Sequence, residues 1–185
     1  SKMLNHTIVA KAKDWIYSSA CPVKEIIEYI RTQNYLREAQ VEAIEVYLFL
    51  KIEGKNRPLA TLFKEGFFLN HEDLSALPLS ISTRTFLEEN LPARALFEFS
   101  RTPQPNQKGK TLLPDIEKQI TDNPESIDYE AVISNLFYGV TYSDYLFSLP
   151  MGAGKTYLMA SFIYLDLYFA SLEPENKAFA HNLSL

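Results

Sequence analysis

Residues 149–156 read Leu-Pro-Met-Gly-Ala-Gly-Lys-Thr, and this stretch decides the fold class that the sequence predicts. The preceding residues, 142–149, are aromatic and aliphatic enough for a short buried strand, and residues 156–171 predict a long apolar helix. Glycines in the turn let backbone amides approach an oxyanion closely, and the following helix presents its N-terminal amides to the same place. The stretch therefore predicts a strand, a glycine turn and a helix that together bind polyphosphate.

Individual residues of this turn have distinct expected roles. We expect Lys155 to reach the β- and γ-phosphates of a nucleotide and the Thr156 hydroxyl to bind the bridging Mg²⁺. The full set of expected phosphate-binding residues is Pro150, Met151, Gly152, Ala153, Gly154, Lys155 and Thr156. The strict P-loop pattern has a glycine where this chain has Leu149, so the strict pattern is missed. A glycine turn that only links a strand to a helix is the alternative, but the apolar segments on both sides favour nucleotide binding.

Most of the first 140 residues predict helices rather than strands. Residues 36–52 give the clearest pattern, since their apolar side chains recur at helical spacing until Gly54. Gln40 lies on that apolar stripe, where its amide needs hydrogen-bond partners for both its donor and its acceptor atoms. Adenine offers both kinds of partner, whereas an ordinary glutamine at a helix flank would bond to backbone or water.

Helix starts and one loop are also predicted from local residues. Thr85, three residues before Glu88, is compatible with a capping box, and Asn123 followed by Pro124 predicts the start of a later helix. Residues 101–114 contain three prolines, one glycine, two lysines and one arginine. This composition predicts an exposed loop or an internal boundary, whose cations could touch phosphates but are more typical of a solvated loop.

The composition of the chain restricts the cellular compartment and the classes of binding partner that we expect. The formal net charge of −5 comes from residues 112–147, which hold seven acidic residues and one basic residue, so overall acidity says little about partners. The lone Cys21 cannot form an internal disulfide, and the N-terminus lacks the pattern of a secretory signal. The longest apolar stretch, residues 157–172, is too short to cross a membrane and contains Asp166. We therefore expect a soluble, cytoplasmic protein without a membrane partner.

Two segments resemble a known family. The form Met-Gly-x-Gly-Lys-Thr without a leading glycine resembles motif I of the superfamily 2 helicases and translocases, and residues 148–160 look most like the DEAD/DEAH-type helicase modules of type I and type III restriction enzymes. Residues 36–44, Leu-Arg-Glu-Ala-Gln-Val-Glu-Ala-Ile, are similar to the segment that precedes motif I in this superfamily. The resemblance implies that Gln40 reads the adenine edge and that Arg37 positions Gln40 or touches a phosphate. An exposed helix arginine is the alternative for Arg37.

The resemblance implies an α/β fold, in which a predominantly helical region precedes an incomplete RecA-like P-loop NTPase core. Four segments are expected. They are a helical N-terminal segment at 1–35, the glutamine-bearing helix at 36–53, a helical insertion or subdomain at 54–139, and the truncated start of the RecA-like core at 140–185. The resemblance itself covers only about residues 36–50 and 143–185, so it does not explain the insertion.

The function implied is ATP binding by the N-terminal part of an ATP-dependent DNA helicase or translocase, plausibly the restriction subunit of a type III-like restriction-modification system. Duplex DNA and a modification subunit would be partners of the full-length protein. The resemblance implies that the parent protein hydrolyses ATP. In the family an Asp-Glu pair holds Mg²⁺ and activates water, and no such pair follows Lys155 in this sequence. We therefore expect this chain alone to be inactive. The alternatives are another P-loop phosphotransferase and a non-enzymatic helical interaction module.

Overall fold

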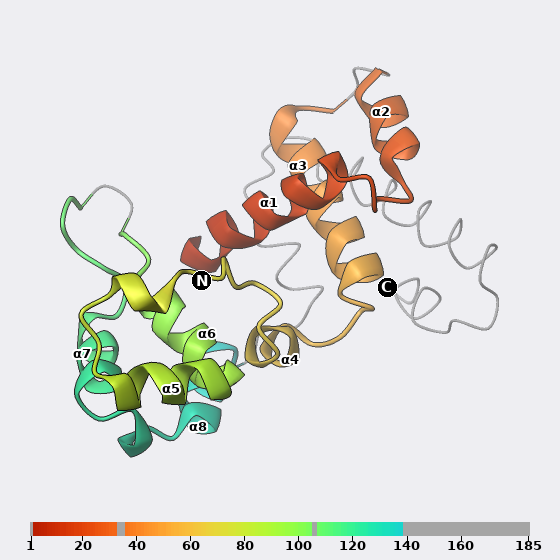
Figure 1. Ribbon diagram of the computed structural model, residues 1–185. Helices are drawn as coiled ribbons and strands as arrows, with labels where there is room; N and C mark the ends of the chain where they lie inside the picture. Colours follow the sequence, from red (N-terminus) through yellow and green to blue (C-terminus); the bar gives the residue numbers. More distant parts are fainter. Residues whose placement is uncertain (1, 33–35, 105–106, 139–185) are drawn as a thin grey trace. The chain divides into compact units, whose positions relative to one another are not determined.

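The computed structural model describes residues 2–32, 36–104 and 107–138, and every regular element in these ranges is helical (Figure 1). The only β-type pairing in them is an isolated antiparallel bridge between Pro103 and Thr111. The predicted α/β class is therefore wrong for the described part of the chain, which is all-helical. The physical reason is that the apolar residues here recur at helical spacing and bury helix faces. The residues from which a strand was predicted, 142–149, lie outside the described ranges.

The described residues belong to two compact units. Residues 2–7 and 57–138 belong to one, which we call the α6 unit, and residues 8–56 belong to the other, which we call the α3 unit. The first helix, α1 (Lys2–Tyr17), contributes residues to both. Each unit is described separately below.

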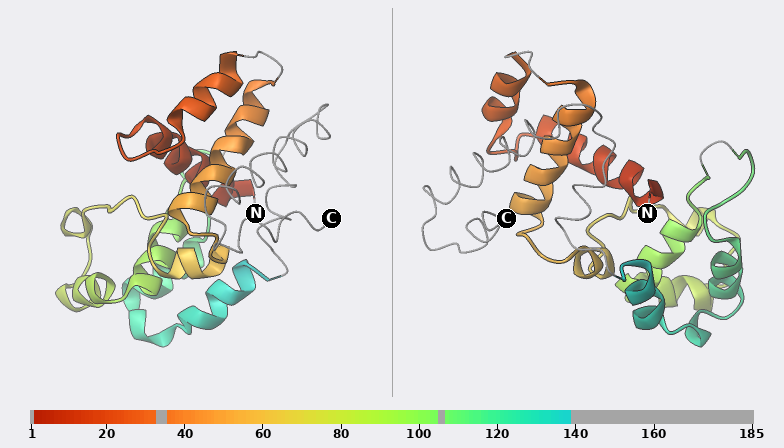
Figure 2. Two further views of the ribbon diagram at one scale, coloured as in Figure 1. Left: turned by 90° about the vertical axis from the view of Figure 1, so that its right-hand side faces the viewer. Right: turned by 180° about the vertical axis from the view of Figure 1, so that it is seen from behind.

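The α3 unit is built from helices in the first third of the chain. After α1 come α2 (Lys24–Thr32) and α3 (Glu38–Leu48), and α3 continues into a π-helix, η1 (Phe49–Glu53). Figure 2 shows these segments, coloured red to light orange, from two further directions. The Trp15 ring of α1 packs at 5.9 Å from the Phe49 ring. The core is completed by buried aliphatic side chains from all three helices and η1, namely Ile8, Ala12, Ile16, Ile27, Ile44, Leu48 and Leu50.

The α6 unit consists of short helices packed around α6 (Leu91–Ser100). Its other elements are α4 (Leu59–Lys64), the 3-10 turn η2 (Leu74–Ala76), α5 (Ile81–Glu89), α7 (Pro114–Asp122), the 3-10 turn η3 (Pro124–Ser126) and α8 (Tyr129–Leu136). Helices α4, α5, α7 and α8 all contact α6. Their shared core consists of Leu74, Leu87, Ala93, Leu96, Phe97 and Ile120.

Side-chain caps set where two of these helices begin. The Ser80 hydroxyl accepts a hydrogen bond from the Thr83 backbone N–H at 3.1 Å, so α5 begins before Thr85 and the capping box predicted at Thr85 is wrong. Asn123 and Pro124 begin only the 3-10 turn η3. The following helix begins after Asp128, whose carboxylate accepts from the Ala131 N–H at 3.1 Å.

No helix in the described ranges is long and apolar enough to cross a membrane.

Candidate functional site

The first turn of α3 holds both of the expected nucleotide-site residues that the structure describes. Arg37 is the N-cap residue and Gln40 is the third residue of the helix. The Gln40 side chain is 2% exposed, and its Oε1 accepts a hydrogen bond from the Arg37 backbone N–H at 2.8 Å. This is the half of a capping box that a glutamine at the third position supplies, because backbone N–H groups at a helix start have no partner within the helix. Arg37 itself is exposed.

The bond to Arg37 gives Gln40 a local structural role. It is the backbone contact expected of an ordinary helix-flank glutamine. A glutamine amide has two lone pairs on its oxygen and two N–H donors, so one bond to Oε1 is chemically compatible with a contact to adenine. Residues 150–156, from which the phosphate site was predicted, lie outside the described ranges. The structure therefore gives no distance between Gln40 and the glycine turn.

Charged side chains join α3 to the two helices that precede it. Arg31 of α2 lies 3.1 Å from a Glu38 carboxylate oxygen and 2.5 Å from a Glu45 oxygen. The Glu45 side chain is 1% exposed, so burial raises the pKa of Glu45, and the neighbouring Arg31 guanidinium opposes that shift. Lys13 of α1 pairs with Glu42 at 2.5 Å. These contacts fix the helix that carries Gln40.

Sequence reasoning missed the Arg31–Glu45 pair, since both residues look like ordinary helix-surface charges. One signal was present. Glu45 is flanked by Ala43, Ile44 and Val46, and a charge inside such an apolar run is either buried and paired or on a different face.

Lys51 is a second buried charged residue of the α3 unit. It lies in the π-helix η1 and is 1% exposed. Its Nζ lies 3.4 Å from Asn56 Oδ1 and 5.9 Å from the centroid of the Tyr47 ring. Burial lowers the pKa of Lys51 to about 8. The signal noted for Glu45 is present here too, since Lys51 lies between Leu50 and Ile52 in an apolar run.

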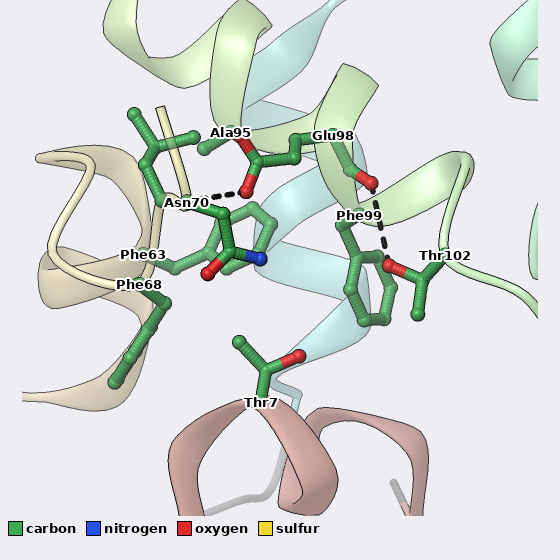
Figure 3. Close-up of a pocket in the computed structure, with 9 residues that line it drawn as sticks. Thr7, Phe63, Phe68, Asn70, Ala95, Glu98, Phe99 and Thr102 are labelled. Atoms are coloured by element: carbon green, nitrogen blue, oxygen red, sulfur yellow. Dashed lines mark hydrogen bonds between the residues drawn. The ribbon is translucent and has the colours of Figure 1, made fainter. Parts of the chain in front are cut away.

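A cavity with mixed lining lies among the described residues of the α6 unit, as Figure 3 shows. Phe63, Phe68 and Phe99 form its apolar walls, and the Asn70 side chain extends toward the space above Thr7. Glu98 fixes the loop between α4 and η2, because its carboxylate accepts a hydrogen bond from the Asn70 backbone N–H at 2.5 Å.

This cavity is too small for a nucleotide. Its volume is about 30 Å³, enough for one or two water molecules, whereas pockets that bind cofactors measure roughly 300–1,000 Å³. Within the described ranges there is also no cluster of three or more His, Cys, Asp or Glu side chains that could hold a metal ion. This cavity is therefore not a candidate for the nucleotide site.

Comparisons of the chain with protein-family models, with curated proteins and with solved structures found no match. The candidate site therefore has to be judged on the chemistry of its own residues.

Proposed function

We propose that the chain is the ATP-binding part of an ATP-dependent DNA helicase or translocase, specifically of the restriction subunit of a type III-like restriction-modification system in the cytoplasm. The observation that carries the proposal is the sequence of residues 150–156, Pro-Met-Gly-Ala-Gly-Lys-Thr. Two glycines, a lysine and a threonine in this order supply the three kinds of group that Mg²⁺-ATP requires, which are backbone amides, a cation and a hydroxyl.

The chemistry of these amide, ammonium and hydroxyl groups fits a nucleoside triphosphate with its metal ion. Backbone amides of Gly152 and Gly154 would hold phosphate oxygens, and the Lys155 ammonium would neutralise part of their charge. Thr156 would ligate Mg²⁺, an ion that prefers oxygen ligands and usually takes few of them from protein. Duplex DNA and a modification subunit are the proposed partners of the full-length protein.

A titration of Mg²⁺-ATP by calorimetry tests the phosphate assignment. We expect weak binding by the parent chain and none by Lys155→Ala, because the variant loses the charge closest to the β- and γ-phosphates. Lys118→Ala is the matched control, since Lys118 is an exposed lysine of α7 that pairs with Asp122. Equal binding by Lys155→Ala and the parent would show that the phosphate assignment is wrong.

The Gln40 contact needs a variant that separates its two roles. Gln40→Glu keeps an oxygen that accepts from the Arg37 N–H, and Glu is a usual residue at this position of a capping box. The same change removes both amide donors, so adenine loses a partner. We expect the parent to prefer ATP to GTP and Gln40→Glu to lose that preference. Because Gln40 is 2% exposed, the new carboxylate should also lower the thermal stability, so the two nucleotides are compared at a temperature at which parent and variant are both folded.

Gln40→Ala removes both roles and should lose stability as well as base preference. If Gln40→Glu instead retains the preference for ATP, Gln40 is a capping residue only.

The all-helical architecture of the described residues favours a second candidate, a non-enzymatic helical interaction module. Absence of any ATP binding by the parent chain would support that candidate.

A further inference from the structure

The segment between α6 and α7 forms an arm that stands away from its helices. Its two sides pair through the bridge of Pro103 with Thr111, and the Gln104 N–H donates to the Lys110 carbonyl at 2.8 Å. At the base, the Leu112 N–H donates to the Thr102 carbonyl at 2.9 Å. Figure 1 shows this arm in green, extending beyond the ends of α6 and α7. We call residues 102–104 and 107–113 the basic arm.

The tip of the basic arm is fully accessible. Residues 107–110, Gln-Lys-Gly-Lys, are all exposed. Gly109 has a positive φ of 79°, and an added Cβ would meet no atom within 4 Å, so the tip has open space around it. The base is anchored in contrast, because Leu112 is only 8% exposed. The arm is therefore anchored at its base, and its tip projects into solvent.

All charged residues of the arm and its base are basic. Residues 101–114 contain no acidic residue, although the whole chain has a net charge of −5. Arg101 pairs with Glu72 at 3.0 Å and lies 3.5 Å from Glu117, so it is held at the base. The side chains of Lys108 and Lys110 have no hydrogen bond or ion pair with any described residue. Two exposed lysines thus lie two residues apart in the sequence at the tip, and no carboxylate of a described residue pairs with either.

We propose that the basic arm contacts the phosphate backbone of duplex DNA. The chemistry of the tip favours nucleic acid over a protein partner, because protein interfaces are enriched in aromatic residues and depleted in lysine. Lysine, glutamine and backbone N–H groups are the usual contacts to phosphate oxygens, and the tip offers Gln107, Lys108, Lys110 and the exposed backbone around Gly109. The choice of DNA as the polyanion rests on the proposed function. Recognition is expected to be independent of base sequence.

Salt dependence of DNA binding tests the proposal without ATP. Binding of the full chain to a fluorescein-labelled duplex is followed by anisotropy at increasing salt concentration. Each phosphate contact contributes about 0.9 to the slope of log K against log salt. We therefore expect Lys108→Gln/Lys110→Gln to flatten the slope by about 1.8 and to weaken binding at low salt.

A matched control removes two lysines elsewhere. Lys24→Gln/Lys55→Gln makes the same change in net charge, and both residues are exposed in the α3 unit. We expect this control to keep the slope of the parent. The proposal is overturned if the arm variant keeps the parent slope, if the control flattens the slope equally, or if the parent does not bind the duplex at low salt. Binding of the same variants to phosphatidylserine vesicles is measured in parallel. The proposal is also overturned if the arm variant loses binding to these vesicles and keeps its binding to the duplex.

The outcome is independent of the nucleotide site. If Lys155→Ala loses ATP binding while the arm variant keeps the parent slope, the proposed function stands and the arm proposal fails. If the arm variant flattens the slope while the parent chain binds no ATP, the arm is a polyanion site and the proposed function fails.

Discussion

Lys51 is the residue whose environment has the clearest consequence for stability. Its pKa is about 8 in the folded chain against an ordinary value of 10.5. Between these pH values the unfolded chain binds more protons than the folded chain, so the free energy of unfolding rises as pH increases from about 8 to about 10.5. Below pH 8 the full cost of burying the charge is present. The shift corresponds to about 3 kcal/mol.

Lys51→Met is expected to remove this pH dependence, because methionine fills a similar space without a charge. Urea unfolding followed by Trp15 fluorescence should show a variant that is more stable than the parent near pH 7 and closer to it at high pH. Lys24→Met provides the control, since Lys24 is exposed and should keep the parental profile. A parent whose stability is flat across the window, or a variant that rises with pH as the parent does, contradicts the assignment.

Lys51 and Glu45 show what sequence reasoning misses at the residue scale. Both are charged residues that are 1% exposed, and their burial depends on which helices pack against them. Gln40 was singled out correctly as a residue of an apolar stripe, and its burial confirms that part of the interpretation. Its bond to the Arg37 N–H was not foreseen in detail, because capping geometry requires the exact first residue of the helix. Whether Gln40 also reads adenine stays a prediction.

At the scale of elements, periodic patterns predicted existence better than boundaries. The helix predicted at 36–52 is confirmed in outline as α3 followed by η1, and Gly54 follows η1 as expected. The change to π geometry after Leu48 was not predicted, because π-helical turns are rare and occur mostly as single turns inside α-helices. The error at Thr85 has a similar origin. Ser80 and Thr85 are both reasonable caps by composition, and only the packing of α5 decides between them.

The loop predicted at 101–114 was likewise predicted in its position but not in its detailed structure. Its exposure is confirmed at residues 107–110. The cross-arm hydrogen bonds were not predicted, because proline-rich composition indicates where regular structure stops and does not specify a paired arm. The α/β class failed for a different reason. It rested on residues 142–171, which lie outside the described ranges. The helical region expected before them agrees with residues 2–138, where every regular element described is helical.

At the scale of the molecule, the structure divides the described chain between residues 56 and 57, and assigns residues 2–7 to the later unit. No composition change marks residue 7, which lies inside α1. A unit that combines segments distant in sequence depends on long-range contacts, and periodicity and turn residues report only on local structure. The division can nevertheless be tested with groups that the chain already contains.

Trp15 is the chain's single tryptophan and lies in the α3 unit at 7% exposure, so its fluorescence reports unfolding of that unit, while circular dichroism reports the helices of both. Ile44 and Leu96 are fully buried, one in each unit, and truncation of either to alanine should cost about 2–5 kcal/mol. We expect Ile44→Ala to lower the urea midpoint seen by fluorescence. Leu96→Ala should leave that midpoint in place and shift only the dichroism transition, because its core is in the α6 unit. Equal shifts of the fluorescence midpoint by both variants would mean that the described residues unfold as one cooperative structure.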